Sequence, residues 1–126
     1  MNWYFLIAAA LSFLTAFVHA YFGGREVDAI IQTSKNLGID IRTISQIVWH
    51  SVTVSFIMMG GFCLKYSFSV ANKDLIIYLL IQILAFSALF IFYNLTKFGD
   101  ILHYIQWVIF LTIGAFILLG YRNALS

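Results

Sequence analysis

The sequence predicts an all-α fold, an integral membrane antiparallel four-helix bundle, and two observations lead to this prediction. Hydrophobic residues make up 63% of the 126 residues and charged residues only 10%, whereas soluble domains carry about a quarter charged residues. The apolar residues also gather into four segments, each of about 20 residues and long enough to cross roughly 30 Å of hydrocarbon as a helix. We therefore expect a single four-span domain covering residues 1–126.

The first span is predicted over residues 3–22, where only Ser12, Thr15 and His19 interrupt the apolar run. No lysine or arginine precedes it, which favours a membrane helix over a signal peptide. The connection over 25–40 carries apolar residues at helical spacing. It is expected to extend the first helix or to lie along the membrane interface. We expect Gly38 to end this segment and Asp40 to cap the next helix.

Three further spans are predicted over residues 44–65, 74–95 and 101–121. The links between them are short, so neighbouring helices are expected to be antiparallel, with both termini on one side of the membrane. Basic residues are divided almost evenly between the two sides. Those on the side opposite the termini are spread over a longer loop, which favours cytoplasmic termini.

The three histidines supply the main functional clue. His19 lies near the end of the first span, His50 near the start of the second and His103 near the start of the fourth. Because the helices alternate in direction, these positions fall in the same leaflet at a similar depth. Ionisable side chains within a membrane usually face the protein interior, so the sequence predicts one polar, histidine-lined site near one membrane face.

Three imidazoles and a carboxylate suit a transition metal such as zinc, copper or iron. We expect His19, His50, His103 and Glu26 as ligands, with Asp100 orienting His103. Gln106 and Trp107 are expected to lie next to the ligands. Arg25 is a candidate for binding a lipid headgroup. An open coordination position would allow chemistry on a lipid-soluble substrate, but the sequence identifies no catalytic residue.

Two alternatives stay open. His19 and His50 could ligate a b-type haem, which would make the chain an electron-transfer protein. The chain could instead be a non-enzymatic accessory subunit or small carrier that forms a homo-oligomer or joins a larger membrane complex. Its small-residue stripe suits such close helix packing, and this stripe consists of Ala8, Ser12, Ala16 and Ala20. A net charge of +2 is too small and too scattered for nucleic-acid binding.

Several of these residues also carry a family resemblance. His19 with the run Gly23-Gly24-Arg25-Glu26, the pair Trp49-His50, and Gln106-Trp107 followed by Gly114 resemble a group of small, uncharacterised bacterial membrane proteins with four spans. The resemblance implies the same fold, a bacterial inner-membrane location and a shared role for the quoted residues. It implies no activity. One departure is Ile105, where the group's pattern has proline before the Gln-Trp pair.

Overall fold

The structure is a computed structural model that describes residues 1–125, and these residues form helices joined by short connections. Four continuous helical stretches are long and apolar enough to cross a membrane, as the sequence predicts. The elements are α1 (Trp3–Val18), η1 (His19–Asp28), α2 (Ala29–Thr33), α3 (Ile39–Phe68), α4 (Lys73–Tyr93), η2 (Asn94–Phe98) and α5 (Gln106–Leu125).

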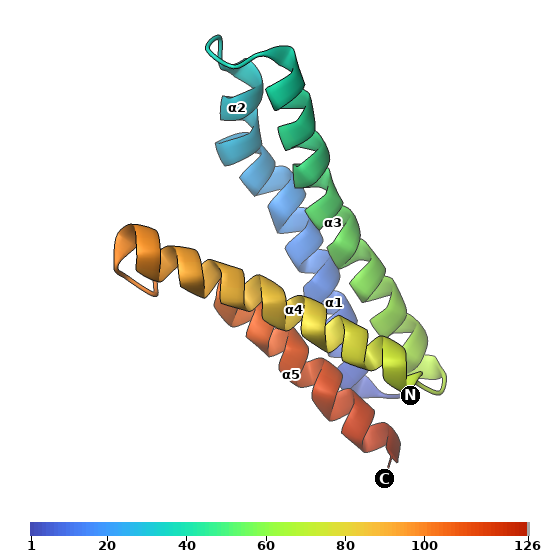
Figure 1. Cartoon of the computed structure of the whole chain (residues 1–126). Coiled ribbons are helices and arrows are strands. Elements are labelled where there is room, and N and C mark those ends of the chain that lie inside the picture. Colours follow the sequence, from blue (N-terminus) through green and yellow to red (C-terminus); the bar gives the residue numbers. More distant parts are fainter. Residues whose placement is uncertain (126) are drawn as a thin grey trace.

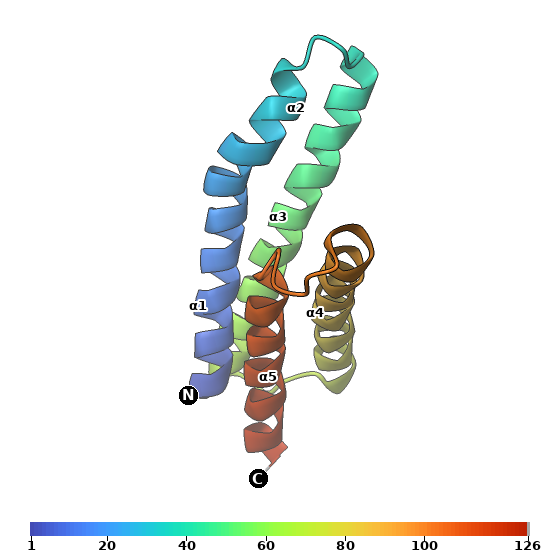
Figure 2. The same ribbon diagram turned by 90° about the vertical axis from the view of Figure 1, so that its left-hand side faces the viewer.

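The helices form two hairpins that meet at one end and splay apart at the other (Figures 1 and 2). The first hairpin comprises α1, η1 and α2 packed on α3, and the second comprises α4, extended by η2, packed on α5. Both termini lie at the joined end (Figure 1). The chain therefore differs from a bundle in which four helices pack along their whole length.

The joined end is fixed by the N-terminus. The Asn2 backbone N–H donates to the Ser67 carbonyl at 2.7 Å, and the Asn2 side-chain amide donates to the Gly120 carbonyl, also at 2.7 Å. The ring of Phe5 is fully buried and lies so close to Gly120 that a Cβ at that glycine would come within 2.9 Å of it. These contacts connect α1 to both α3 and α5.

The small-residue stripe on α1 is used inside the chain. Ala8, Ser12 and Ala16 are all buried, and only Ala20 is exposed. Across the α1–α3 interface, a Cβ at Gly60 would come within 2.9 Å of the Phe13 ring. Helices of the same chain therefore cover most of this stripe, which the accessory-subunit interpretation assigns to contacts with another subunit.

The expected extension of the first helix into residues 25–40 is confirmed as far as Thr33, because this helix runs from Trp3 to Thr33 without a break. Two other predicted boundaries differ from those observed. Gly38 does not end that helix but precedes α3, and Asp40 lies in the first turn of α3. The fourth helix begins at Gln106, so residues 101–105 belong to the connection before it.

The two hairpins have unequal lengths. The helix Trp3–Thr33 has 31 residues and α3 has 30, whereas α5 has 20. At about 1.5 Å per residue, the first hairpin is roughly 15 Å longer than α5. The other arm of the second hairpin, Lys73–Phe98, has 26 residues, so the two tips lie apart mainly because the hairpins splay (Figures 1 and 2).

Candidate functional site

The site with the most unusual backbone begins at His19. The helix widens here into the π-helix η1, which covers the sequence HAYFGGREVD. π-helical hydrogen bonds span five residues instead of four, as in the bond from the Ala29 N–H to the Gly24 carbonyl. Long π segments are rare and often mark functional positions.

His19 contacts α3 through Trp49. The two rings stack with their centroids 4.2 Å apart and their planes 15° apart. The Nε2 atom of His19 lies 3.2 Å from the Trp49 backbone carbonyl. Because a carbonyl only accepts hydrogen bonds, this contact places the proton on Nε2 and leaves Nδ1 of a neutral imidazole as an acceptor.

Gly23 makes the close approach of the indole possible. A Cβ built at Gly23 would lie 2.9 Å from Cζ2 of Trp49, closer than real Cβ contacts allow. A Cβ at the neighbouring Gly24 would lie 4.0 Å from the indole Nε1, which is ordinary contact. The first glycine of the pair therefore has a steric role that the second does not share.

Two polar atoms on this face of α3 lack a hydrogen-bond partner. The indole Nε1 of Trp49 and the hydroxyl of Thr53, one turn further along α3, are both buried and unpaired. Leaving a buried polar group unpaired costs about 1–3 kcal/mol. We call His19, Trp49 and Thr53, where α1 and η1 face α3, the polar seam.

A hydrogen-bonded latch closes the first hairpin beyond the polar seam. The Gln32 side chain donates to Asp28 Oδ1 at 3.1 Å and to the Arg42 carbonyl at 2.9 Å. In return, the Arg42 guanidinium donates to the Gln32 carbonyl at 2.8 Å. Asp28 is only 8% exposed. These contacts join α2 to the start of α3 near the hairpin tip.

His50 points away from the polar seam. Its side chain is exposed and lines a shallow, open hollow on α3 together with Gln46, Ile47, Ser51 and Val54. By contrast, the Thr53 hydroxyl on the same helix is buried. His50 directly follows Trp49 in the chain, and the Trp49 ring stacks on that of His19.

His103 lies in the connection of the second hairpin rather than in a span. Its ring stacks on Phe98 with centroids 3.8 Å apart. Asp100 does not orient the imidazole as predicted, because its Oδ1 accepts from the Leu102 N–H at 2.9 Å. Trp107 donates from Nε1 to the Ile101 carbonyl at 2.9 Å. These residues stabilise the connection locally.

The predicted metal ligands do not come together in this structure. Within residues 1–125, no group of three or more His, Cys, Asp or Glu side chains is placed to hold a metal ion. Glu26 and Gln106 are exposed. Arg25 lies 5.0 Å from the centre of the Tyr21 ring and donates to its hydroxyl at 3.1 Å. The splaying of the hairpins separates the connection before α5, which carries His103, from the first hairpin (Figure 1).

Sequence reasoning missed the role of Asn94. This side chain is fully buried. It donates to the carbonyls of Ile101 and Tyr104 at 2.8 and 2.9 Å and accepts from the Tyr104 N–H at 3.1 Å. Its sequence signal was a lone asparagine at a helix end shortly before Gly99, which has a φ of +66°.

Comparisons with known proteins add no family to this description. The chain matches no protein-family model, and neither the curated proteins nor the solved structures yield a match.

Proposed function

We propose that the chain is a four-span integral membrane protein that binds the polar head of a lipid-soluble molecule at the polar seam. Membrane insertion is supported by four apolar helices of sufficient length and by large apolar side chains exposed along all of them. The run over residues 43–64 carries no charged side chain. At about 1.5 Å per residue its length is about 33 Å, close to the thickness of a bilayer's hydrocarbon core.

The observation that carries the proposal is the pair of unpaired buried groups on Trp49 and Thr53. Polar groups within apolar helices are costly unless they bind something. Both groups lie on the α3 face that meets the ten-residue π-helix η1. A ligand that accepts from the indole N–H would recover the free energy lost by its burial.

The chemistry of the polar seam favours a neutral ligand head. Trp49 offers one donor, the Thr53 hydroxyl can donate or accept, and Nδ1 of His19 accepts. No lysine, arginine or ionised acid belongs to this set. The complementary ligand group is a hydroxyl or a carbonyl on an otherwise apolar molecule. This makes the protein a small membrane carrier or binding protein.

Titration with a long-chain alcohol tests the proposal. Indole N–H signals of ¹⁵N-labelled protein in detergent would be followed by NMR, with Trp49 assigned from the Trp49→Phe variant. We expect the Trp49 signal to shift saturably with the alcohol and not with an alkane of equal length. Trp3, 61% exposed at the start of α1, is the internal control. Equal responses to alcohol and alkane would exclude a polar recognition site.

Thr53→Val provides a matched variant, since valine keeps the shape and removes the hydroxyl. We expect alcohol affinity to fall about fivefold, which corresponds to one hydrogen bond of about 1 kcal/mol. Thermal stability without ligand should not fall, because the hydroxyl has no protein partner to lose. Thr112→Val is the control, since that hydroxyl bonds the Val108 carbonyl at 2.8 Å within α5.

Metal binding is a second candidate function, favoured by the position of His50 directly after Trp49, whose indole ring stacks on His19. Glu26, in the same π-helix as His19, would be the carboxylate ligand. Metal content measured in the purified protein and in His50→Ala tests this candidate. Metal that is present in the parent protein and lost from the variant would support it. Equal stoichiometry in the two would remove His50 as a ligand.

A further inference from the structure

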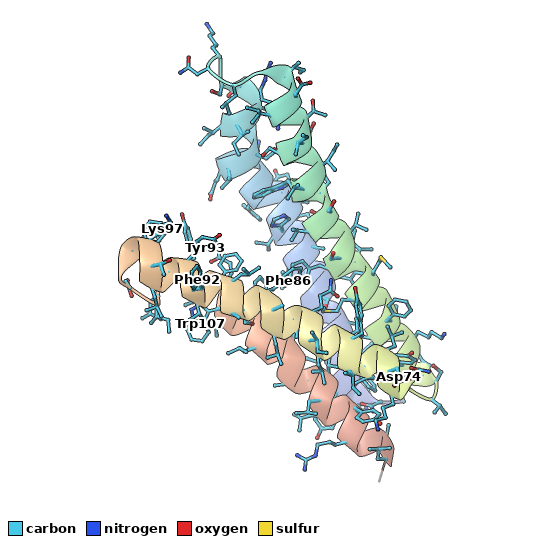
Figure 3. All side chains as sticks on the ribbon, viewed as in Figure 1. Asp74, Phe86, Phe92, Tyr93, Lys97 and Trp107 are labelled. Atoms are coloured by element: carbon cyan, nitrogen blue, oxygen red, sulfur yellow. The ribbon has the colours of Figure 1, made fainter. Side chains whose placement is uncertain are left out.

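A second feature lies on α4 and η2, outside the polar seam. Phe86, Phe90, Tyr93 and Lys97 follow one another at intervals of four, three and four residues, which places them on one face of a helix. Figure 3 shows Phe86 in the angle between the hairpins, with Tyr93 and Lys97 on the edge of the second hairpin that faces the first. We call these four residues the α4 stripe.

The inner end of the α4 stripe is closed by aromatic packing. The Phe110 ring lies 5.4 Å from the rings of both Phe56 and Phe90, and Phe56 lies 5.6 Å from Phe86. This cluster joins α3, α4 and α5 where the hairpins begin to diverge. Beyond it, η1, α2 and η2 make their main contacts within their own hairpins.

The outer end of the α4 stripe is exposed and firmly positioned. Tyr93 is 51% exposed, and the Lys97 side chain is exposed without an ion pair among the described residues. Between them, Asn94 is buried and holds the following connection by three hydrogen bonds. The ammonium group is thus presented at the end of an aromatic wall, one helical turn beyond Tyr93.

We propose that the α4 stripe binds one anionic phospholipid. Its acyl chain lies along Phe86, Phe90 and Tyr93, and its phosphate meets Lys97 and the Tyr93 hydroxyl. An apolar wall that ends in an unpaired cation fits a molecule with a long apolar tail and a negative head. A zwitterionic lipid fits the same wall but gains less from the lysine. This site is independent of the polar seam, whose donors and acceptor suit a neutral head.

Native mass spectrometry of the full chain tests this site. Protein would be equilibrated with equal amounts of phosphatidylglycerol and phosphatidylcholine in detergent, and the retained lipids would be counted. We expect the parent protein to prefer phosphatidylglycerol and Lys97→Gln to lower that preference about fivefold. Lys73→Gln, at the opposite end of the same helix, is the matched control and should keep the preference.

Two further variants separate charge from packing. Lys97→Arg should retain the preference for the anionic lipid, because it preserves the positive charge. Tyr93→Ala should reduce retention of both lipids, because it shortens the apolar wall. A parent protein without headgroup preference, or equal losses in Lys97→Gln and Lys73→Gln, would overturn the proposal. The shift of the Trp49 indole signal with the long-chain alcohol should be the same in all four variants. Failure of the phospholipid proposal can therefore be distinguished from failure of the polar-seam function.

Discussion

At the scale of single residues, the position of Trp49 depends on the absence of a side chain at Gly23. We predict that Gly23→Ala destabilises the protein by about 1–3 kcal/mol, as overpacking does, because its Cβ would lie 2.9 Å from the indole ring. Gly24→Ala is the matched control, since its Cβ would lie 4.0 Å from the nearest indole atom. Thermal melting in detergent measures both variants, and equal melting temperatures would contradict this steric role.

Asn94 gives a second prediction at the residue scale. Replacing it by alanine removes three hydrogen bonds to the connection before α5, each contributing about 1 kcal/mol. We expect Asn94→Ala to lose about 3 kcal/mol of unfolding free energy. Asn36→Ala, at an exposed position near the first hairpin tip, should lose almost none. Chemical denaturation measures both, and similar losses would show that the bonds contribute little.

The same residues show how far sequence reasoning reaches. His19 could be identified as a polar group within an apolar span, and the structure places it against another polar group. Its partner Trp49 could not be identified, because an indole near a membrane face is typical of the interfacial belt. Only the packing of α3 against η1 turns that indole inward. Of the residues that carry the family resemblance, His19, Gly23 and Trp49 lie together in the first hairpin. Gln106 and Trp107 lie in the second hairpin.

At the scale of elements, hydropathy predicts the existence of the four long helices but not where they end. The first helix continues through Gly23 and Gly24 because packing on α3 supports a segment whose intrinsic helix propensity is low. The fourth helix begins later than predicted for a different reason. The residues from Ile101 to Tyr104 are apolar enough to resemble a span, but Asn94 binds their backbone groups and holds them in a connection.

The latch between α2 and α3 provides a prediction at the element scale. Gln32→Ala removes two donated hydrogen bonds, to Asp28 and to the Arg42 carbonyl. At about 1 kcal/mol each, their loss should speed local amide exchange in α2 and early α3 by about thirtyfold. Exchange in α5 should not change. Lys35→Ala, exposed at the hairpin tip, is the control, and unaltered exchange in Gln32→Ala would show that the latch is dispensable.

At the scale of the whole molecule, the separation of the hairpins decides whether the three histidines can meet. Helical periodicity and loop length predict neighbours along the chain, but they do not predict the angle between two hairpins. That angle depends on the packing of α1 against α5, which includes Phe5 on Gly120, and on the aromatic cluster that joins Phe56 of α3 to Phe110 of α5. The distance between His103 and the polar seam therefore depends on contacts made far from either.

The separation of the hairpins can be measured as the distance between their tips. Double electron–electron resonance would report this distance between spin labels at Lys35→Cys and Lys97→Cys. Phe110→Leu keeps an apolar side chain but removes ring contacts with Phe56, Phe86 and Phe90, so we expect a broader distribution. Labels at Asp74→Cys and Lys97→Cys, both in the α4–η2 helix, should give the same distribution with or without Phe110. An unchanged tip-to-tip distribution would show that the aromatic cluster does not set the angle.

A short-distance component in the protein with native Phe110 would have a further consequence, because closing the hairpins brings His103 toward His19 and His50. Only in that closed arrangement could ligands from both hairpins share one metal ion.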